Sequence, residues 1–496
     1  MRLAPTVIAI LGASALAAME TPVTGTRQLG MGAAGTATTE DHTVPWWNSA
    51  ALGWETGAEG GAHPAWGQLS PDAIGLDVTA GFHAYGEILQ HADQLLDAAA
   101  RVKELGAAGV ADKADLQSLL KVAKWISELD NPADSVLATG NVAAGVRMGR
   151  FAVGLRVAGE AAAYAANIDL LNVIPDVNLD VLANQINANV PAGDTNLDSL
   201  SASQADAIYT ALGGTGGSYG SLAPGVDANA TAAVQAIDDA MKELGVAGPL
   251  GAEVARLLTA TASGTGTLDQ NTTSVVIQGF ILTEIPISIG FPVSDYASFG
   301  ASVKLMNGRV NGTRILVFQD DVEEAMVDLK GEFKDTFNLG VDLGFQAKAG
   351  NWRIGVNATN LNSPIFKAPA SAAGAVTDYR IDPQVTIGLG WRPVDWFTIA
   401  ADIEQFEVGT INPLVMSRRA GAGFEFAAIP WIDLRGGVYG NIADSEAPPV
   451  VTAGAGLGPE WFRIDAAVAC ASELQDFGEW QLPTELRASI GVSSRF

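Results

Sequence analysis

The sequence has few of the residues on which metal, redox and disulfide chemistry depend. Cys470 is the only cysteine among 496 residues, so neither an intrachain disulfide nor a CxxC redox pair can form. The four histidines form no HExxH motif and no Cys/His cluster, which argues against a zinc site. No GxxxxGK[ST] phosphate loop occurs either. We therefore predict no metal, no cofactor and no enzymatic activity.

Basic residues are also scarce. The chain has 28 lysines and arginines against 55 aspartates and glutamates, a formal net charge of -27. A phosphate-binding surface needs clustered basic side chains, so we expect no nucleic-acid partner. The acidic balance suits a surface that meets cations or simply a well-solvated one, and the solvated surface is the simpler interpretation.

Long apolar runs are absent beyond the N-terminus. Residues 1–18 have the pattern of a signal peptide, with Arg2, an apolar stretch from Val7 to Leu16, and the small residues Ala15 and Ala17 before the expected cleavage. A buried helix is the alternative for this segment. No other stretch approaches the roughly 20 apolar residues of a spanning helix. If the exported protein enters a membrane, it must therefore do so as a closed barrel.

The last twelve residues alternate between apolar and polar side chains. Leu486, Ala488, Ile490 and Val492 fall on one face of a strand with the terminal Phe496, and polar or small residues fall on the other. The same alternation recurs in residues 74–83, 337–348, 385–392, 397–404 and 462–469. Repeated segments of about ten residues, apolar outside and polar inside, are typical of a transmembrane β-barrel. We predict that Phe496 serves as an assembly signal for the barrel-assembly machinery.

Connection lengths support this interpretation. Short turns near residues 149, 293, 350, 394, 430 and 460 alternate with longer connections, as in bacterial barrels with short periplasmic turns and long extracellular loops. The pattern predicts an all-β, antiparallel transmembrane barrel of about 14 strands over residues 73–496, with both termini in the periplasm. Tryptophans flank the short turns, where the indole ring suits a membrane interface: Trp352, Trp391, Trp396, Trp431 and Trp461.

Two long insertions, at about residues 88–136 and 164–273, show helical spacing. The stripes Leu116, Leu119 and Leu120 and Val234, Ile237 and Met241 belong to them, and a Gly/Ser-rich linker lies between. We expect these extracellular helices to cap the barrel mouth. Their apolar stripes are expected to pack against each other and the rim, with a hydrophobic-ligand site as the alternative.

Residues 19–72 fit no wall strand, because an extra strand would break the even count. Glycines allow close backbone packing, and the aromatic end offers rings that fill space. We therefore predict an N-terminal plug, with a flexible periplasmic tail as the alternative. The residues that we predict to form the plug and gate the lumen are Gly30, Gly32, Gly35, Asp41, Trp46, Trp47, Asn48 and Leu52. Candidate wall partners are Arg353, Arg435, Asp433 and Asp465.

This region resembles the N-terminal signature of the FadL-like outer-membrane superfamily, most closely its members labelled conjugal-transfer TraF-like. The pattern is G-x-G-x-A, an acidic residue, then an aromatic, Asn-Pro-Ala and Leu, and Ser49 stands where the pattern has proline. Residues 355–364 and 400–404 resemble strand ends of the same proteins. The resemblance implies an outer-membrane barrel with an N-terminal plug.

The resemblance also implies a function. We expect passive transport of small hydrophobic molecules across the outer membrane, with the membrane lipid and such a ligand as partners. A non-transporting structural barrel, or one associated with secretion or conjugation, is the alternative; it would present its helical loops to a partner. A continuous apolar tunnel beside the plug would favour transport, and a filled lumen would favour the structural role.

Overall fold

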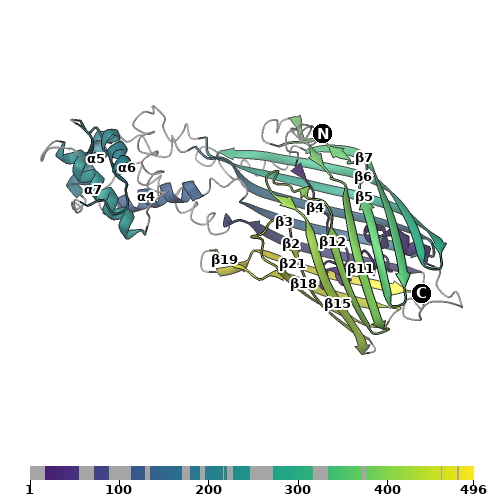
Figure 1. Cartoon of the computed structure of the whole chain (residues 1–496). Helices are drawn as coiled ribbons and strands as arrows, with labels where there is room; N and C mark the ends of the chain where they lie inside the picture. The colour runs from purple at the N-terminus through teal and green to yellow at the C-terminus, as the bar shows by residue number, and fades with distance from the viewer. Residues whose placement is uncertain are drawn as a thin grey trace, which may run out of the picture.

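Fourteen antiparallel strands form a closed barrel (Figure 1). The computed structural model describes residues 17–54, 72–88, 113–128, 134–169, 179–189, 196–215, 217–219, 227–245, 272–316, 333–370, 376–429, 431–459, 461–477 and 480–496. The wall strands are β2 (Ala73–Tyr85), β3 (Ser135–Met148), β4 (Phe151–Asn167), β5 (Ser274–Ser294), β6 (Ala297–Leu316), β7 (Phe333–Ala349), β8 (Trp352–Thr359), β11 (Gln384–Val394), β12 (Phe397–Glu404), β15 (Arg419–Ile429), β16 (Ile432–Asn441), β17 (Val450–Leu457), β18 (Arg463–Ala471) and β21 (Glu485–Arg495). The predicted count of 14 is confirmed.

The first and last wall strands close the barrel. β2 pairs with β21 in an unbroken register from Ala73 opposite Arg495 to His83 opposite Glu485. Every other wall strand pairs with its neighbours in sequence, so the wall is an up-and-down meander. This closure leaves no unpaired sheet edge along the wall.

The alternation predicted from the sequence sets the two faces of the wall. In β7, Phe337, Leu339 and Leu343 are exposed on the outside, whereas Asp342 and Gln346 are buried inside. An apolar outer face with a polar inner face is the arrangement of a barrel surrounded by lipid. None of the described helices is both long and apolar enough to span a bilayer.

One end of the barrel carries short turns and the other carries long connections (Figure 1). We call these the short-turn end and the loop end. Trp352, Trp396, Trp431 and Trp461 are exposed at the short-turn end, as a position at a membrane interface requires. The long connections contain short extra strands: β9 (Ile365–Phe366), β10 (Tyr379–Arg380), β13 (Val408–Gly409), β14 (Met416–Ser417), β19 (Leu474–Phe477) and β20 (Trp480–Pro483).

The lumen near the loop end is apolar, which the polar-inside rule did not predict. Val276 and Phe280 of β5 face inward and belong to a buried cluster with Met306 of β6 and with Phe366 and Tyr379. The rings of Phe280 and Tyr379 stack with centroids 4.1 Å apart. The physical reason is that β9 and β10 supply apolar side chains to this cluster, so the wall residues there face protein rather than water.

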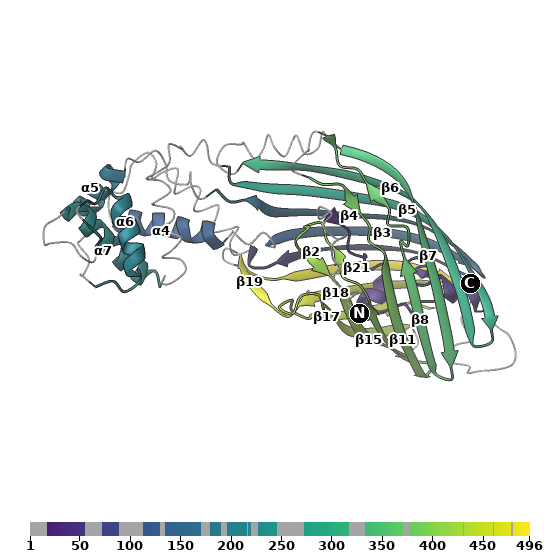
Figure 2. The same cartoon turned by 45° about the horizontal axis from the view of Figure 1, so that its top comes forward.

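Four helices form a separate group: α4 (Lys113–Glu128), α5 (Leu179–Asn189), α6 (Ala202–Ala211) and α7 (Ala228–Glu243). They lie beyond the loop end and do not cap the mouth, so that expectation is wrong (Figures 1 and 2). Val234, Ile237 and Met241 of α7 are fully buried, and α7 contacts the other three helices. Because these apolar side chains are buried within the helical group, α7 does not offer them to the barrel rim.

Candidate functional site

Residues 17–54 lie inside the barrel, and we call them the luminal segment. Figure 2 shows part of this segment, in purple, among the wall strands. It begins with β1 (Ala17–Ala18), which pairs in parallel with β10, and continues through α1 (Thr26–Gly30), α2 (Val44–Trp47) and a 3-10 helix, η2 (Ser49–Gly53). Most of its residues are buried. Residues 1–16 and 55–71, which complete the predicted signal peptide and plug, are outside the described residues.

Two inward carboxylates of the wall hold the luminal segment. Asp77 of β2 accepts hydrogen bonds from Thr26 N and Thr26 Oγ1, at 2.8 and 2.7 Å, and lies 2.7 Å from His42 Nε2. Asp402 of β12 accepts from Thr36 N and Thr36 Oγ1, at 2.8 and 2.7 Å. These contacts fix the segment to opposite parts of the wall, because charged acceptors make strong hydrogen bonds in buried surroundings.

Wall arginines hold the same segment from other sides. Arg353 of β8 forms an ion pair with Glu40, and Arg147 of β3 donates to the Glu40 carbonyl oxygen at 2.6 Å. Arg156 of β4 donates to Thr24 Oγ1 at 2.8 Å. The buried charge of Glu40 is thus paired, which an ionised group in a lumen needs to offset its desolvation.

The predicted wall partners behave differently from one another. Arg353 does contact the luminal segment. Arg435 instead binds Glu425 at 2.7 Å and also Asp433 and Asp465, all of them wall residues. The link to the luminal segment runs through Glu425, which receives two bonds from Arg27, at 2.8 and 2.9 Å.

The predicted plug glycines lie where backbones approach closely. Gly32 has φ +66°, and a Cβ there would stand 2.2 Å from the carbonyl oxygen of Ala422 in β15. A Cβ on Gly30 would meet Gly454 Cα of β17 at 3.2 Å. Gly35 faces its own segment, where a Cβ would meet the Trp47 ring at 2.8 Å. A larger side chain at Gly32 would therefore push the segment off the wall.

The other predicted plug residues are all in the luminal segment. Trp47 donates its indole N–H to Thr24 O at 2.7 Å, and Asn48 Nδ2 donates to Thr36 O and to Phe345 O of β7, at 3.1 and 3.2 Å. Leu52 is buried in an apolar cluster that includes Ala152 of β4. Asp41 accepts hydrogen bonds from Thr43 N and Thr43 Oγ1, both within the segment. Their gating role stays a prediction.

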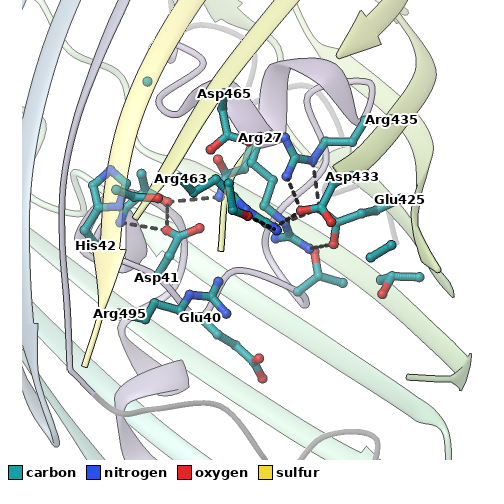
Figure 3. Close-up of a pocket in the computed structure, with 18 of the residues that line it drawn as sticks. Arg27, Glu40, Asp41, His42, Glu425, Asp433, Arg435, Arg463, Asp465 and Arg495 are labelled. Atoms are coloured by element: carbon teal, nitrogen blue, oxygen red, sulfur yellow. Dashed lines mark hydrogen bonds and ion pairs between the residues drawn. The ribbon is translucent and has the colours of Figure 1, made fainter. Parts of the chain in front are cut away.

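A charged cavity of about 420 Å³ lies against the luminal segment at the short-turn end of the barrel (Figure 3). Arginines and carboxylates from both the segment and the wall line it: Arg27, Glu40, Asp41, His42, Arg392, Glu425, Asp433, Arg435, Arg463, Asp465 and Arg495. Figure 3 shows Asp41, His42 and Arg495 on one side and the Arg27–Glu425–Arg435 network on the other. The cavity suits water and ions better than an apolar molecule.

Charges shift the pKa values of the segment's own groups. Burial raises the pKa of Asp41, but His42, Arg27 and Arg495 lower it more, and the result is about 2. Burial lowers the pKa of His42, yet the hydrogen bond to Asp77 and the charge of Asp41 outweigh burial and raise it. Both shifts favour the charged forms of Asp41 and His42.

The ladder between β4 and β5 is interrupted within the wall. The register is the same on both sides, yet Gly154 and Leu155 have no ladder partners opposite Ile285 and Pro286. Proline has no N–H, so the bond that residue 286 would donate to the Gly154 carbonyl is missing. We call these four residues the β4–β5 gap. Such an omission is costly in lipid, where water cannot replace the lost bond.

Apolar groups lie on both the luminal and the lipid-facing side of the gap. On the inside, a Cβ on Gly154 would stand 2.5 Å from Trp46 Cη2 and 3.3 Å from Pro286 Cγ. On the outside, an apolar hollow of about 760 Å³ crosses the wall surface, lined by Ile74, Leu76, Ala144, Val146, Val153, Gly154, Leu155, Ile285, Phe462 and Val492 among others. Only one backbone layer separates the Trp46 ring from this hollow.

The sequence analysis missed several residues that hold the segment, above all Glu40, and Thr26 and His42 with their shared partner Asp77. The polar face of the 74–83 strand did mark Asp77 as inward. Its partner could not be found, because the pairing depends on the path of the segment across the lumen. Pro286 marks the β4–β5 gap in the sequence, but an analysis of alternating polarity does not take proline into account.

Comparison with known families gives a match over residues 71–404 to the family described as F plasmid transfer operon, TraF, protein. The match covers more than half of the chain. The chain belongs to this TraF family. The predicted resemblance to TraF-like members is therefore confirmed.

Two solved structures are similar to this TraF-family chain at low identity. The Pseudomonas putida toluene transporter TodX is 11% identical, with 95% of this chain and 98% of that chain covered and a TM-score of 0.45. A Pseudomonas aeruginosa FadL homologue is also 11% identical, with the same coverage and a TM-score of 0.43. No curated protein sequence matches the chain.

Proposed function

We propose that this TraF-family protein is an outer-membrane barrel that lets small hydrophobic molecules pass passively, with the luminal segment as its gate. The apolar outer face and the closure of the barrel by β2 and β21 support the location. The observation that carries the transport proposal is the β4–β5 gap. There, a single backbone layer lies between a lipid-facing apolar hollow and the Trp46 ring of the luminal segment.

The route begins at the apolar cluster of the loop end. Phe280, Phe366 and Tyr379 are buried there, so this cluster must open to take up an apolar molecule from outside. The charged cavity at the short-turn end is a poor exit for such a molecule, because moving an apolar molecule among charged groups gives no favourable free energy. A sideways exit through the β4–β5 gap into the hollow keeps the molecule in apolar surroundings throughout.

In the described state the route is closed. Apart from the charged cavity, two voids beside the luminal segment measure about 20 and 30 Å³, less than a small aromatic molecule requires. Trp46 must therefore move for passage, and the hydrogen bonds of Thr26, Thr36 and His42 to the wall restrain the segment to which it belongs.

A structural barrel associated with secretion or conjugation is the second candidate. The filled lumen favours it, as does the helical group, which lies apart from the mouth and so stays available to a partner (Figure 1). Under this alternative, removing the helices would abolish the partner's binding, while changes at the β4–β5 gap would have no functional effect.

The substitution Pro286→Val separates the two candidates. Valine restores the missing N–H and favours a strand, so the β4–β5 ladder can close. Cells with Pro286→Val should take up a neutral apolar fluorophore at the rate of cells without the protein. Pro292→Val is the matched control, because Pro292 lies on the same strand, near the turn and away from the gap. Uptake by Pro286→Val at the wild-type rate would contradict the sideways route.

A further inference from the structure

The three tryptophans of the luminal segment differ in one respect. Trp47 donates its indole N–H to Thr24 O at 2.7 Å, and Trp54 donates to Gln346 Oε1 of β7 at 2.8 Å. The indole N–H of Trp46 is buried and has no hydrogen-bond partner within the described parts of the chain. A buried donor without an acceptor carries a desolvation cost that the other two avoid.

The unpartnered tryptophan is also the one at the β4–β5 gap. Its ring lies against Gly154 of β4, where a Cβ would come within 2.5 Å of Cη2 and 2.6 Å of Cζ2. It also approaches Gly145 of β3, where a Cβ would stand 3.4 Å from Cζ3. A molecule that passes from the lumen to the outer hollow must therefore contact this indole.

The surroundings of Trp46 disfavour an anionic ligand. The small void beside the ring is lined by the carboxylates of Asp402 and Glu404 and by Arg419. Arg419 already donates to Glu404 Oε1 at 3.1 Å and to Thr21 O at 3.0 Å. A carboxylate here would face two like charges and an arginine that is already bound, and leaving a buried charge unpaired is costly.

On the basis of the proposed function, we infer that Trp46 is the specificity-determining residue of the route. It selects uncharged apolar molecules that carry one hydrogen-bond acceptor, such as a ketone, ester or ether oxygen. The acceptor satisfies the indole N–H as the molecule crosses the gap, so a plain hydrocarbon of the same size is less favoured. One neutral hydrogen bond corresponds to a preference of about 2- to 12-fold.

Acetophenone and ethylbenzene are a suitable pair of probes, because they are similar in shape and only the ketone accepts a hydrogen bond. The measurement is the ratio of their initial uptake rates into cells with the wild-type protein, corrected for cells without it. Trp46→Phe keeps a ring at the gap and removes the N–H, and it should lower the ratio by about 2- to 12-fold. Trp54→Phe removes a bonded N–H elsewhere in the segment and should leave the ratio unchanged.

Three outcomes are distinguishable. A lower ratio in Trp46→Phe alone supports the inference. Uptake of both probes with an unchanged ratio overturns the inference and leaves the proposed function standing. Failure of the wild-type protein to increase uptake of either probe overturns both.

Nuclear magnetic resonance keeps the inference testable if Trp46→Phe fails to fold. The wild-type protein is labelled with ¹⁵N at its indole groups and placed in lipid nanodiscs, and the Trp46 signal is assigned from Trp46→Tyr or from selective labelling. Acetophenone should shift the Trp46 N–H resonance and ethylbenzene should shift it far less. Equal shifts with both probes, or none with either, would refute the hydrogen bond.

Discussion

Replacing Asp77 by alanine should release the luminal segment from the wall. The side chain of Asp77 accepts two bonds from Thr26 and lies 2.7 Å from His42 Nε2, so one substitution removes three buried contacts. Bonds to a charged acceptor contribute about 1.5–3 kcal/mol each, and they are not additive. Because water from the charged cavity can replace part of the loss, we expect the segment to be destabilised by about 3–4 kcal/mol.

Hydrogen exchange in lipid nanodiscs measures this effect directly. A loss of about 3–4 kcal/mol raises the exchange rate of amides in residues 24–43 roughly 100- to 1000-fold where exchange follows opening of the segment. Asp395→Ala is the matched control, because Asp395 lines the same cavity but lies at its exposed rim. Equal protection in wild type and Asp77→Ala would refute the view that Asp77 holds the segment.

Four further outcomes are expected. Leu343→Arg, on the lipid face, should lower the free energy of unfolding in vesicles by about 2–4 kcal/mol. Ala427→Arg, which faces the charged cavity, should lower it much less. Equal losses would contradict the assignment of the two faces. Deleting Phe496 should reduce the fraction of barrel inserted, as shown by fractionation. Because the pKa of His42 is raised in the folded protein, the stability that its charge provides is fully present below about pH 6.5 and is lost as the pH rises through the raised value. Thermal unfolding measured against pH should show this loss of stability. His42→Gln should abolish this pH dependence. Deleting residues 19–54 should leave an inserted barrel with higher conductance in planar bilayers, and unchanged conductance would argue against a gate.

The fold could be predicted from the sequence because each wall strand carries its own signal. Alternation in β7 placed Phe337 and Leu343 outside and Asp342 inside without any knowledge of the neighbouring strands. Turn and loop lengths then fixed the strand count. Both signals are local, so one sequence suffices to find them.

The inside of the barrel was harder to predict, because its contacts join distant parts of the chain. Phe280 faces inward at a position where the alternation rule expects a polar residue, and only β9 and β10 explain it. Asp77 was recognisable as inward, but its partners Thr26 and His42 follow from the path of the luminal segment. The β4–β5 gap required the register that sets Pro286 opposite Gly154, and periodicity carries no information about register between strands.

Thr26 lies across the place where the barrel closes, and this has a consequence for biogenesis. Its hydroxyl bonds to Asp77 of β2 and lies 2.8 Å from the hydroxyl of Ser489 of β21, the two strands whose pairing closes the barrel. These strands are more than 400 residues apart in the sequence, so they can join only after β21 has been synthesised and exported. A segment that arrived after closure would have to thread into a finished cylinder. A luminal segment in place before closure would instead bring the two edges of the sheet together through Thr26.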